Sequence, residues 1–297
     1  MARKALLVGL NRYPDPANTL QGCVNDVRQI RALLEGHFDF SRPEDVRVLL
    51  DQQATTAAIR SGLAWLVAGA RPGDVLVFHY SGHGSQVPDR DGDETTDSLD
   101  EIICPYDLDW DDPIADDDLY AAVRHLPAGV ALTVVLDCCH SGTGLREPGG
   151  SGAVRPKFLT HPAAVPGTRG GSLRDRRKPL ERRVRRIGRR AAAAGAVLVA
   201  GCRADQSSAD AFIAGAYHGA LSYFLCRALA ESAYEVSYTR LVRRVRASLR
   251  AHGFEQDPQL EGPAALLQSD VFSPLPVAPC PSPSTRLARV RGGRCNG

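Results

Sequence analysis

The stretch DVLVFHYSGHG at residues 74–84 joins an apolar run directly to a glycine-rich turn. A second run, ALTVVL at residues 131–136, leads in the same way into Asp137-Cys138-Cys139. Both runs are short and nearly continuously apolar, which is typical of strands buried on both faces of a parallel sheet. In such a sheet, ligands and reactive groups gather beyond the carboxyl ends of the strands. The two runs therefore predict a fold class and the place of a site within it.

The rest of the chain alternates strand-like and helix-like patterns. Right-handed crossovers between parallel strands place the intervening helices on both faces of the sheet. The sequence thus predicts an α/β fold with a mostly parallel central sheet. Further strands are expected at residues 4–10, 46–50 and 196–200, and helices at residues 22–34, 56–67, 116–125, 219–230 and 238–252. Thr55 or Thr56 is expected to cap the helix at 56–67.

Size and composition narrow the class of protein. The chain has 297 residues, of which 43% are hydrophobic and 24% charged, as in ordinary globular proteins and unlike collagen, coiled coils or disordered chains. Glycine, proline, serine and arginine dominate residues 146–194, which predicts a flexible linker, and a proline-rich tail at 274–297 is expected to be disordered. No apolar run is long enough to span a membrane or act as a signal peptide, so a cytoplasmic protein without membrane partners is expected.

Two reactive side chains follow the apolar runs at residues 74–80 and 131–136. His83 follows the first strand and Cys139 follows the second, so neighbouring strands would bring an imidazole and a thiol to one sheet edge. A free thiol is only slightly ionised at neutral pH, and an adjacent imidazole can activate it as a nucleophile. Backbone N–H groups after sharp glycine turns can hold a developing oxyanion. The pattern therefore predicts cysteine-dependent acyl transfer.

Several short motifs stand beside the predicted strands: YSGHG at 80–84, DCCHSG at 137–142, GCVNDV at 22–27, Asp100-Glu101, DDDL at 116–119 and GCRADQSSA at 201–209. Together they resemble the metacaspases, which are caspase-like cysteine peptidases. The 56-residue spacing between His83 and Cys139 is close to the spacing in caspases. The resemblance implies a caspase-like fold with a large catalytic region at 1–145 and a small region at 195–273. It implies that His83 is the general base, that Cys139 is the nucleophile, and that the amides of Gly84 and Cys139 hold the oxyanion.

The neighbour of the nucleophile and the specificity pocket have competing interpretations. Cys138 is expected to pack as a small apolar residue, because adjacent residues of an extended segment point to opposite sides. An acidic residue, Asp137, stands two positions before Cys139, and an acidic pocket favours a cationic side chain. The resemblance places Asp26, Ser81 and Asp137 in a pocket for Arg or Lys before the scissile bond. Without the resemblance, Asp26 would be interpreted as a helix-start carboxylate or as a surface carboxylate.

Residues 89–118 carry fourteen acidic residues and one basic residue. A solvated loop is the simpler interpretation, whereas a dense carboxylate cluster can also bind calcium, which accepts six to eight oxygen ligands. The order of residues excludes an EF-hand, because Glu94 stands where that loop requires glycine. The resemblance implies calcium as an activator, with Asp100, Asp116 and Asp117 as ligands. A further acidic ligand expected after the nucleophile has no counterpart.

Residues 174–190 carry ten basic residues and two acidic ones. A solvated linker or contact with nucleic acid is possible for such a run, but it contains no aromatic residue for stacking on bases. An enzyme that cleaves after Arg or Lys would find its own candidate sites there, which predicts self-processing in this linker.

We expect a monomeric endopeptidase that acts on protein or peptide substrates. The alternatives are a non-catalytic caspase-like signalling or binding module and, less favoured, a nucleic-acid-associated regulator.

Overall fold

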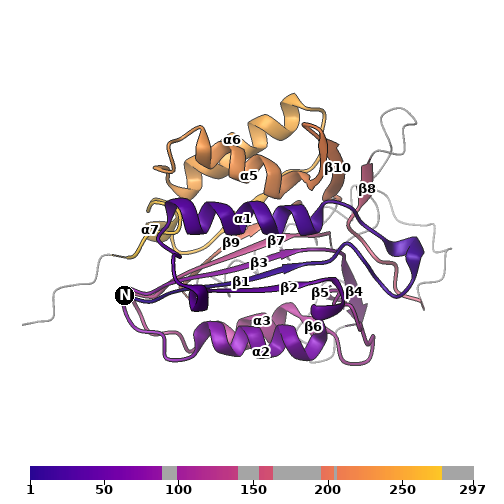
Figure 1. Ribbon diagram of the computed structural model, residues 1–297, viewed down its shortest axis with the longest axis horizontal. Helices are drawn as coiled ribbons and strands as arrows, with labels where there is room; N and C mark the ends of the chain where they lie inside the picture. Colours follow the sequence, from indigo (N-terminus) through magenta and orange to yellow (C-terminus); the bar gives the residue numbers. More distant parts are fainter. Residues whose placement is uncertain (89–98, 140–153, 163–194, 204–205, 276–297) are drawn as a thin grey trace, which may run out of the picture.

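A six-stranded sheet forms the centre of the computed structural model, which describes residues 1–88, 99–139, 154–162, 195–203 and 206–275 (Figure 1). Five strands are parallel, and β12 joins one edge antiparallel. The five predicted strands are confirmed, as is the α/β class. The order across the sheet is β12 (Gln259–Glu261), β9 (Ala196–Ala200), β7 (Ala131–Asp137), β3 (Val75–Ser81), β1 (Arg3–Gly9) and β2 (Val46–Leu50).

Helices cover both faces of the sheet, as predicted (Figure 1). One face carries α1 (Cys23–His37), α5 (Ala220–Ala230) and α6 (Tyr238–Ala251), and the other carries α2 (Thr56–Val67) and α3 (Asp116–Val123). The Thr55 side chain accepts from the N–H of Ala58 and so caps α2. The predicted ends differ most at α1, which continues three residues past Leu34, and at α3, which stops two residues before His125. A short helix, α7 (Ala264–Leu267), lies near the end of the described chain.

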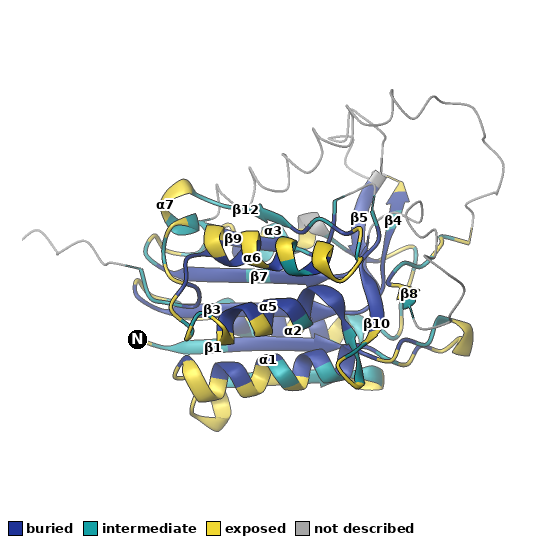
Figure 2. Cartoon of the chain, turned by 90° about the horizontal axis from the view of Figure 1, so that it is seen from above, coloured by how far each residue is buried: buried dark blue, intermediate teal, exposed yellow. Residues whose placement is uncertain are grey.

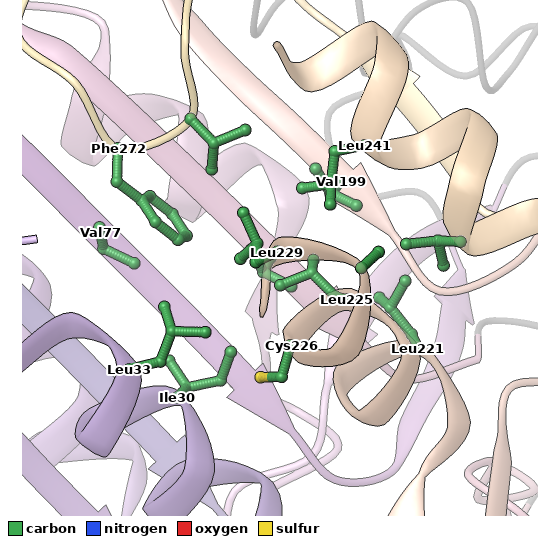
Figure 3. Close-up of a cluster of buried hydrophobic side chains, with 14 of the residues drawn as sticks. Ile30, Leu33, Val77, Val199, Leu221, Leu225, Cys226, Leu229, Leu241 and Phe272 are labelled. Atoms are coloured by element: carbon green, nitrogen blue, oxygen red, sulfur yellow. The ribbon is translucent and has the colours of Figure 1, made fainter. Parts of the chain in front are cut away.

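Two apolar clusters hold these layers together, one on each face. Alternate residues of each central strand enter opposite clusters: Leu7 and Val77 face α1 and α5, whereas Leu6 and Phe78 face α2. Figure 3 shows the first cluster, where side chains of α1, α5 and α6 meet on the sheet. Burial on both faces explains why the strand sequences are almost uniformly apolar, and Figure 2 shows the central strands as the most deeply buried elements.

Six short strands lie beyond the carboxyl ends of the central strands and were not predicted from the sequence. They form two three-stranded sheets, and β8 lies inside the predicted linker at 146–194. β4, β5 and β10 are as long as the predicted β2 and β9, but polar or charged residues interrupt their apolar pattern, and β5 carries two acidic residues. They are β4 (Gly84–Pro88), β5 (Leu99–Ile103) and β6 (Ile114–Ala115) in one sheet, and β8 (Val154–Pro156), β10 (Ala209–Ile213) and β11 (Ala216–Gly219) in the other.

None of the helices in the described part of the chain has the length and apolar character needed to cross a membrane. The predicted self-processing positions at 174–190 lie outside the described residues, as does most of the predicted tail.

Candidate active site

The strands that carry the predicted base and nucleophile are direct neighbours in the sheet. Ser81 at the end of β3 pairs with Asp137 at the end of β7, and His83 and Cys139 each follow two residues later. The sheet order reverses beside β3, because β2 lies on one side of β1 and β3 on the other. Ligands of open α/β sheets bind at such a switch point. The topology therefore brings His83 and Cys139 to the expected edge.

His83 is held in one orientation by backbone and aromatic contacts. Its Nε2 lies 2.8 Å from the carbonyl oxygen of Asn18, so Nε2 carries the proton and Nδ1 keeps the free lone pair. The Tyr13 ring packs on the imidazole at 4.8 Å between centroids. No described residue hydrogen-bonds to the buried Nδ1. Burial lowers the pKa of His83 to about 4, against the opposing hydrogen bond to Asn18, so the imidazole is neutral at physiological pH.

The two adjacent cysteines point into different surroundings. Cys138 belongs to the apolar cluster on the α2 side of the sheet, in agreement with the expected packing role. The Cys139 thiol lies instead against the backbone of Ser208, with its Sγ 3.3 Å from the Ser208 carbonyl oxygen. The six cysteines within the described residues form no disulfide with one another. In this state the thiol donates to Ser208 and does not engage His83.

The two amides expected to hold an oxyanion converge on a single carbonyl oxygen. The N–H groups of Gly84 and Cys139 donate to the carbonyl of Lys157 at 3.0 and 3.1 Å. Lys157 comes from the predicted linker, directly after β8. A reacting carbonyl would need this pair of donors in the same geometry.

The side chain of Lys157 enters the predicted acidic pocket and is fully buried there. Its Nζ lies 2.8 Å from Ser81 Oγ, 3.2 Å from Asp137 Oδ1 and 3.5 Å from Asp26 Oδ2. The three residues assigned to the pocket by resemblance are thus brought together around one ammonium group. Asp26 is a buried residue of α1 and not a surface carboxylate.

The Lys157 ammonium and several hydrogen bonds keep Asp137 charged despite its burial. Asp137 accepts from the N–H and hydroxyl of Ser222 and from the hydroxyl of Ser208, at 2.8 to 2.9 Å. Burial opposes ionisation of Asp137, but Lys157 and these hydrogen bonds outweigh it and lower its pKa. Burial likewise opposes the charge on Lys157, but Asp137 and the other nearby acidic groups raise its pKa above the ordinary value. Lysine and pocket therefore form a charged pair.

The sequence does not identify several residues of the site. Asn18 contributes only a backbone carbonyl, so no side-chain signal identifies it. Gly219 lies against the pocket, where a Cβ would fall under 3 Å from Lys157, Asp137 and Asp26. Its N–H donates to Asp26. Only the fold shows that this glycine, among 28 in the chain, adjoins the pocket.

The three predicted calcium ligands lie on adjacent backbone segments. Ile102 of β5 pairs antiparallel with Ala115 of β6, so Asp100 and the first residues of α3, Asp116 and Asp117, occupy neighbouring positions. No group of three potential metal ligands forms among the side chains that the structure describes, which do not include those of Asp116 and Asp117. Carboxylates are the hard oxygen donors that calcium prefers, so the residue types at these backbone positions suit this ion.

Comparisons with known proteins identify the family of this chain. A family model described as metacaspase, peptidase C14 domain, matches residues 3–148. Metacaspase-1A of Aspergillus niger is 37% identical over 285 residues, covering 87% of this chain and 69% of that protein. Metacaspase-1 of Scheffersomyces stipitis is 36% identical over 290 residues, covering 87% of this chain and 70% of that protein.

Solved structures show the same fold. A crystal structure of a protein from Geobacter sulfurreducens is 25% identical, has a TM-score of 0.64, and covers 93% of this chain and 100% of that one. Caspase-1 from Spodoptera frugiperda is 12% identical, with a TM-score of 0.54 and coverage of 93% and 91%. The relatives and the shared fold lead to one conclusion: the chain belongs to the metacaspases, a family of caspase-like cysteine endopeptidases.

Proposed function

We propose that this metacaspase cleaves peptide bonds after Lys or Arg, with Cys139 as nucleophile and His83 as general base. The observation that carries the proposal is the position of Lys157. Its side chain fills the pocket of Asp26, Ser81 and Asp137, while its carbonyl oxygen accepts from Gly84 and Cys139. A substrate residue before the scissile bond would need both contacts at once.

The charge of the pocket supports selectivity for a cation. Asp26 and Asp137 are buried, and buried carboxylates without a counter-ion are costly. An ammonium or guanidinium group provides the missing charge, and arginine can also bind carboxylates with two parallel hydrogen bonds. A neutral or acidic side chain would leave the carboxylates unpaired. Discrimination against such substrates follows from this cost.

Backbone pairing supports recognition of an extended peptide. β8 pairs antiparallel with β10, with Arg155 opposite Asp210 and Pro156 opposite Ala209. The N–H of Lys157 donates to the carbonyl of Ser208 at 3.1 Å. Addition of a strand to a sheet edge is a common way to bind peptides, because main-chain hydrogen bonds supply affinity and side-chain pockets supply specificity.

The chemistry follows from the positions of these groups. The Cys139 thiol turns from Ser208 and gives its proton to His83 Nδ1, and the thiolate electron pair forms a bond to the carbonyl carbon. The carbonyl electrons move to oxygen, where the N–H groups of Gly84 and Cys139 stabilise the negative charge. As the C–N bond breaks, the leaving nitrogen takes the proton from His83. Water then gives a proton to His83 Nδ1 as its oxygen adds to the thioester carbonyl carbon. The C–S bond breaks, and the Cys139 thiolate takes the proton back from His83 as the acid product leaves.

The same arrangement supports self-processing at the Lys157–Phe158 bond. The docked segment occupies the site as a substrate would, so it also excludes other peptides until it is cleaved or leaves. This position lies within the predicted linker but upstream of residues 174–190.

Calcium, held by Asp100, Asp116 and Asp117, would supply positive charge to the acidic region and so stimulate the enzyme.

Intact-protein mass spectrometry tests self-processing directly. Wild-type protein incubated with calcium should yield fragments 1–157 and 158–297, and Cys139→Ala should stay intact. Lys157→Arg should still be cut after residue 157, whereas Lys157→Gln should not. Arg155→Ala, two positions away, serves as the matched control and should keep the cut. Cleavage at this bond in Cys139→Ala would contradict the proposal.

Peptide hydrolysis tests the specificity. Coumarin peptides ending in Lys or Arg should be cleaved, and matched peptides ending in Asp or Gln should not. Folded protein that cleaves none of them with calcium would instead favour a non-catalytic binding module.

A further inference from the structure

The segment that follows Lys157 is also bound in an ordered way. Gly84 and Phe158 form a parallel β-bridge, and the N–H of Leu159 donates to the carbonyl of Gly84 at 2.9 Å. The hydroxyl of Ser85 donates to the carbonyl of Leu159 at 2.6 Å. Gly84 thus contacts the chain on both sides of the Lys157–Phe158 bond, through its N–H at the Lys157 carbonyl and through its carbonyl at Leu159.

β4 has a free side suited to this contact. Among the described strands it lies at the edge of its small sheet and pairs with β5, with Gly84 opposite Ile103 and Ser85 opposite Ile102. The unpaired edge of a strand can bind an extended chain through its main-chain groups. In the described structure that partner is residues 157–159.

Ser85 has a polar group that needs a partner at this edge. The residue is 1% exposed, and among the described residues its hydroxyl donates to Leu159. A buried hydroxyl without an acceptor carries a desolvation cost, so this position favours a peptide carbonyl. The Ser85 side chain is therefore a recognition group for the chain beyond the scissile bond.

The side chain of Leu159 supplies a second contact. It packs, partly buried, against the apolar cluster on the α2 side of the sheet, to which Ile103 and Cys104 belong. Thr160, the next residue, is exposed, and the ring of His161 then meets Trp110 edge to face at 4.6 Å between centroids. Residue 159, the second after the scissile bond, is thus the apolar anchor of this side.

We propose that β4 is a substrate-binding edge for the leaving-group side of the peptide. Ser85 positions the carbonyl of the second residue after the scissile bond, and the apolar cluster selects a leucine-sized aliphatic side chain there. This inference rests on the proposed function, because it assigns the docked segment the path of a substrate. Holding both sides of the scissile bond would fix the reacting carbonyl against the donors of Gly84 and Cys139.

Three substrates test the inference with calcium present throughout. The first is an internally quenched octapeptide with the sequence of residues 154–161, and the second has aspartate in place of its leucine. The third is the tetrapeptide of residues 154–157 carrying a coumarin leaving group, which lacks the downstream residues. For the wild-type enzyme we expect the aspartate peptide to have a kcat/KM lower by about tenfold or more.

The variant Ser85→Ala tests the positioning role. The ratio of kcat/KM on the leucine octapeptide to that on the coumarin peptide should fall about fivefold, with the loss mainly in KM. Ser232→Ala removes a serine hydroxyl bonded to the carbonyl of Ala228 and is the matched control, in which this ratio should stay constant.

The outcomes separate the two proposals. If the coumarin peptide is cleaved but leucine and aspartate octapeptides are cleaved equally well, the inference about β4 is wrong and the proposed function stands. The same holds if Ser85→Ala keeps the wild-type ratio. If folded enzyme cleaves none of the three substrates, the proposed function is overturned and the inference with it.

Discussion

Nζ of Lys157 and Oδ1 of Asp137 lie 3.2 Å apart, and both side chains are fully buried. Asp137 ends a central strand of the sheet, whereas Lys157 belongs to a segment that pairs with the small sheet of β10. The pair therefore links the acidic pocket to one basic side chain that comes directly after β8. The corresponding ion pair between Asp137 and a basic side chain of a substrate should determine which substrates the enzyme accepts.

Asp137→Asn should lower kcat/KM for peptides ending in Lys or Arg by about a hundredfold. The amide keeps one acceptor oxygen, which can serve Ser222 or Ser208 but not both. It also removes one of the charges that compensate the buried cation, and breaking a buried ion pair costs about 3–5 kcal/mol. Hydrolysis of coumarin peptides ending in Lys, Arg and Gln measures the change in selectivity.

A matched control for this substitution is Asp45→Asn, which removes a buried carboxylate paired with Arg42 in the turn before β2. It should keep the preference for basic residues. If Asp137→Asn kept the same preference, Asp137 would have no role in specificity.

Gly219→Ala should block the pocket for long basic side chains. The backbone φ of Gly219 is −68°, which any residue can adopt, so the effect comes from space and not from strain. The new methyl group would fall where the ammonium of Lys157 and the carboxylates of Asp137 and Asp26 meet. We expect kcat/KM on Lys peptides to fall about a hundredfold or more, as measured with the coumarin substrate.

The control is Gly36→Ala, which places a methyl group in open space near the end of α1. Full activity in Gly219→Ala would show that substrates do not enter this pocket.

Sequence patterns sufficed for the central layers of the fold. Strands such as β3 and β7 are buried on both faces and therefore mostly apolar, and α2 has both an apolar stripe and a threonine cap. The short strands beyond the sheet have no such signature. Their positions depend on long-range pairing, as between β8 and β10, which are more than 50 residues apart in the chain.

The candidate site was predictable where side chains carry the chemistry. His83 and Cys139 stand at the ends of strands, and Asp137 precedes the thiol by two residues. The carbonyl of Asn18, which orients the His83 ring, and the limited space beside Gly219 cannot be predicted from the sequence. Lys157 is one of many basic residues in the linker, and only the three-dimensional path of the chain brings it to the pocket.

Cys139→Ala and Cys138→Ala should affect different properties. Removal of the Cys139 thiol eliminates the nucleophile, so turnover of an Arg-ended reporter should fall by about 10³-fold or more. Cys138 packs in the apolar cluster, so Cys138→Ala should lower the melting temperature through lost packing while substantial activity remains.

Coumarin hydrolysis and thermal unfolding, measured on both variants, provide the comparison. Loss of activity in Cys138→Ala together with activity in Cys139→Ala would reverse the assignment of the nucleophile.

Asp116→Asn and Asp117→Asn should raise the calcium concentration that half-activates the enzyme, by about tenfold or more. Each substitution replaces a charged oxygen donor with a neutral one, and calcium affinity depends on the number of charged ligands. Asp39→Asn, at an exposed carboxylate near Arg3, is the control. A calcium titration of activity that is the same in all variants would exclude a metal site at these positions.

Two buried histidines should make the folded state sensitive to acid. Burial lowers the pKa of His79 and of His83 to about 4, below the ordinary value of 6.5. Between these values the unfolded chain binds more protons than the folded one, so the free energy of unfolding falls as the pH decreases. Each histidine contributes a slope of about 1.4 kcal/mol per pH unit at most. This contribution is complete above pH 6.5 and is lost progressively towards pH 4.

Comparison of variants isolates this effect, because Glu261, whose pKa burial raises to about 8, acts in the opposite direction over an overlapping range. Urea unfolding of wild type and His79→Asn at several pH values between 4 and 7 should show a shallower pH dependence in the variant. His125→Asn, at an exposed histidine, should match the wild-type slope. An equal slope in His79→Asn and wild type would mean that His79 is not held neutral by burial, and that the acid sensitivity has another origin.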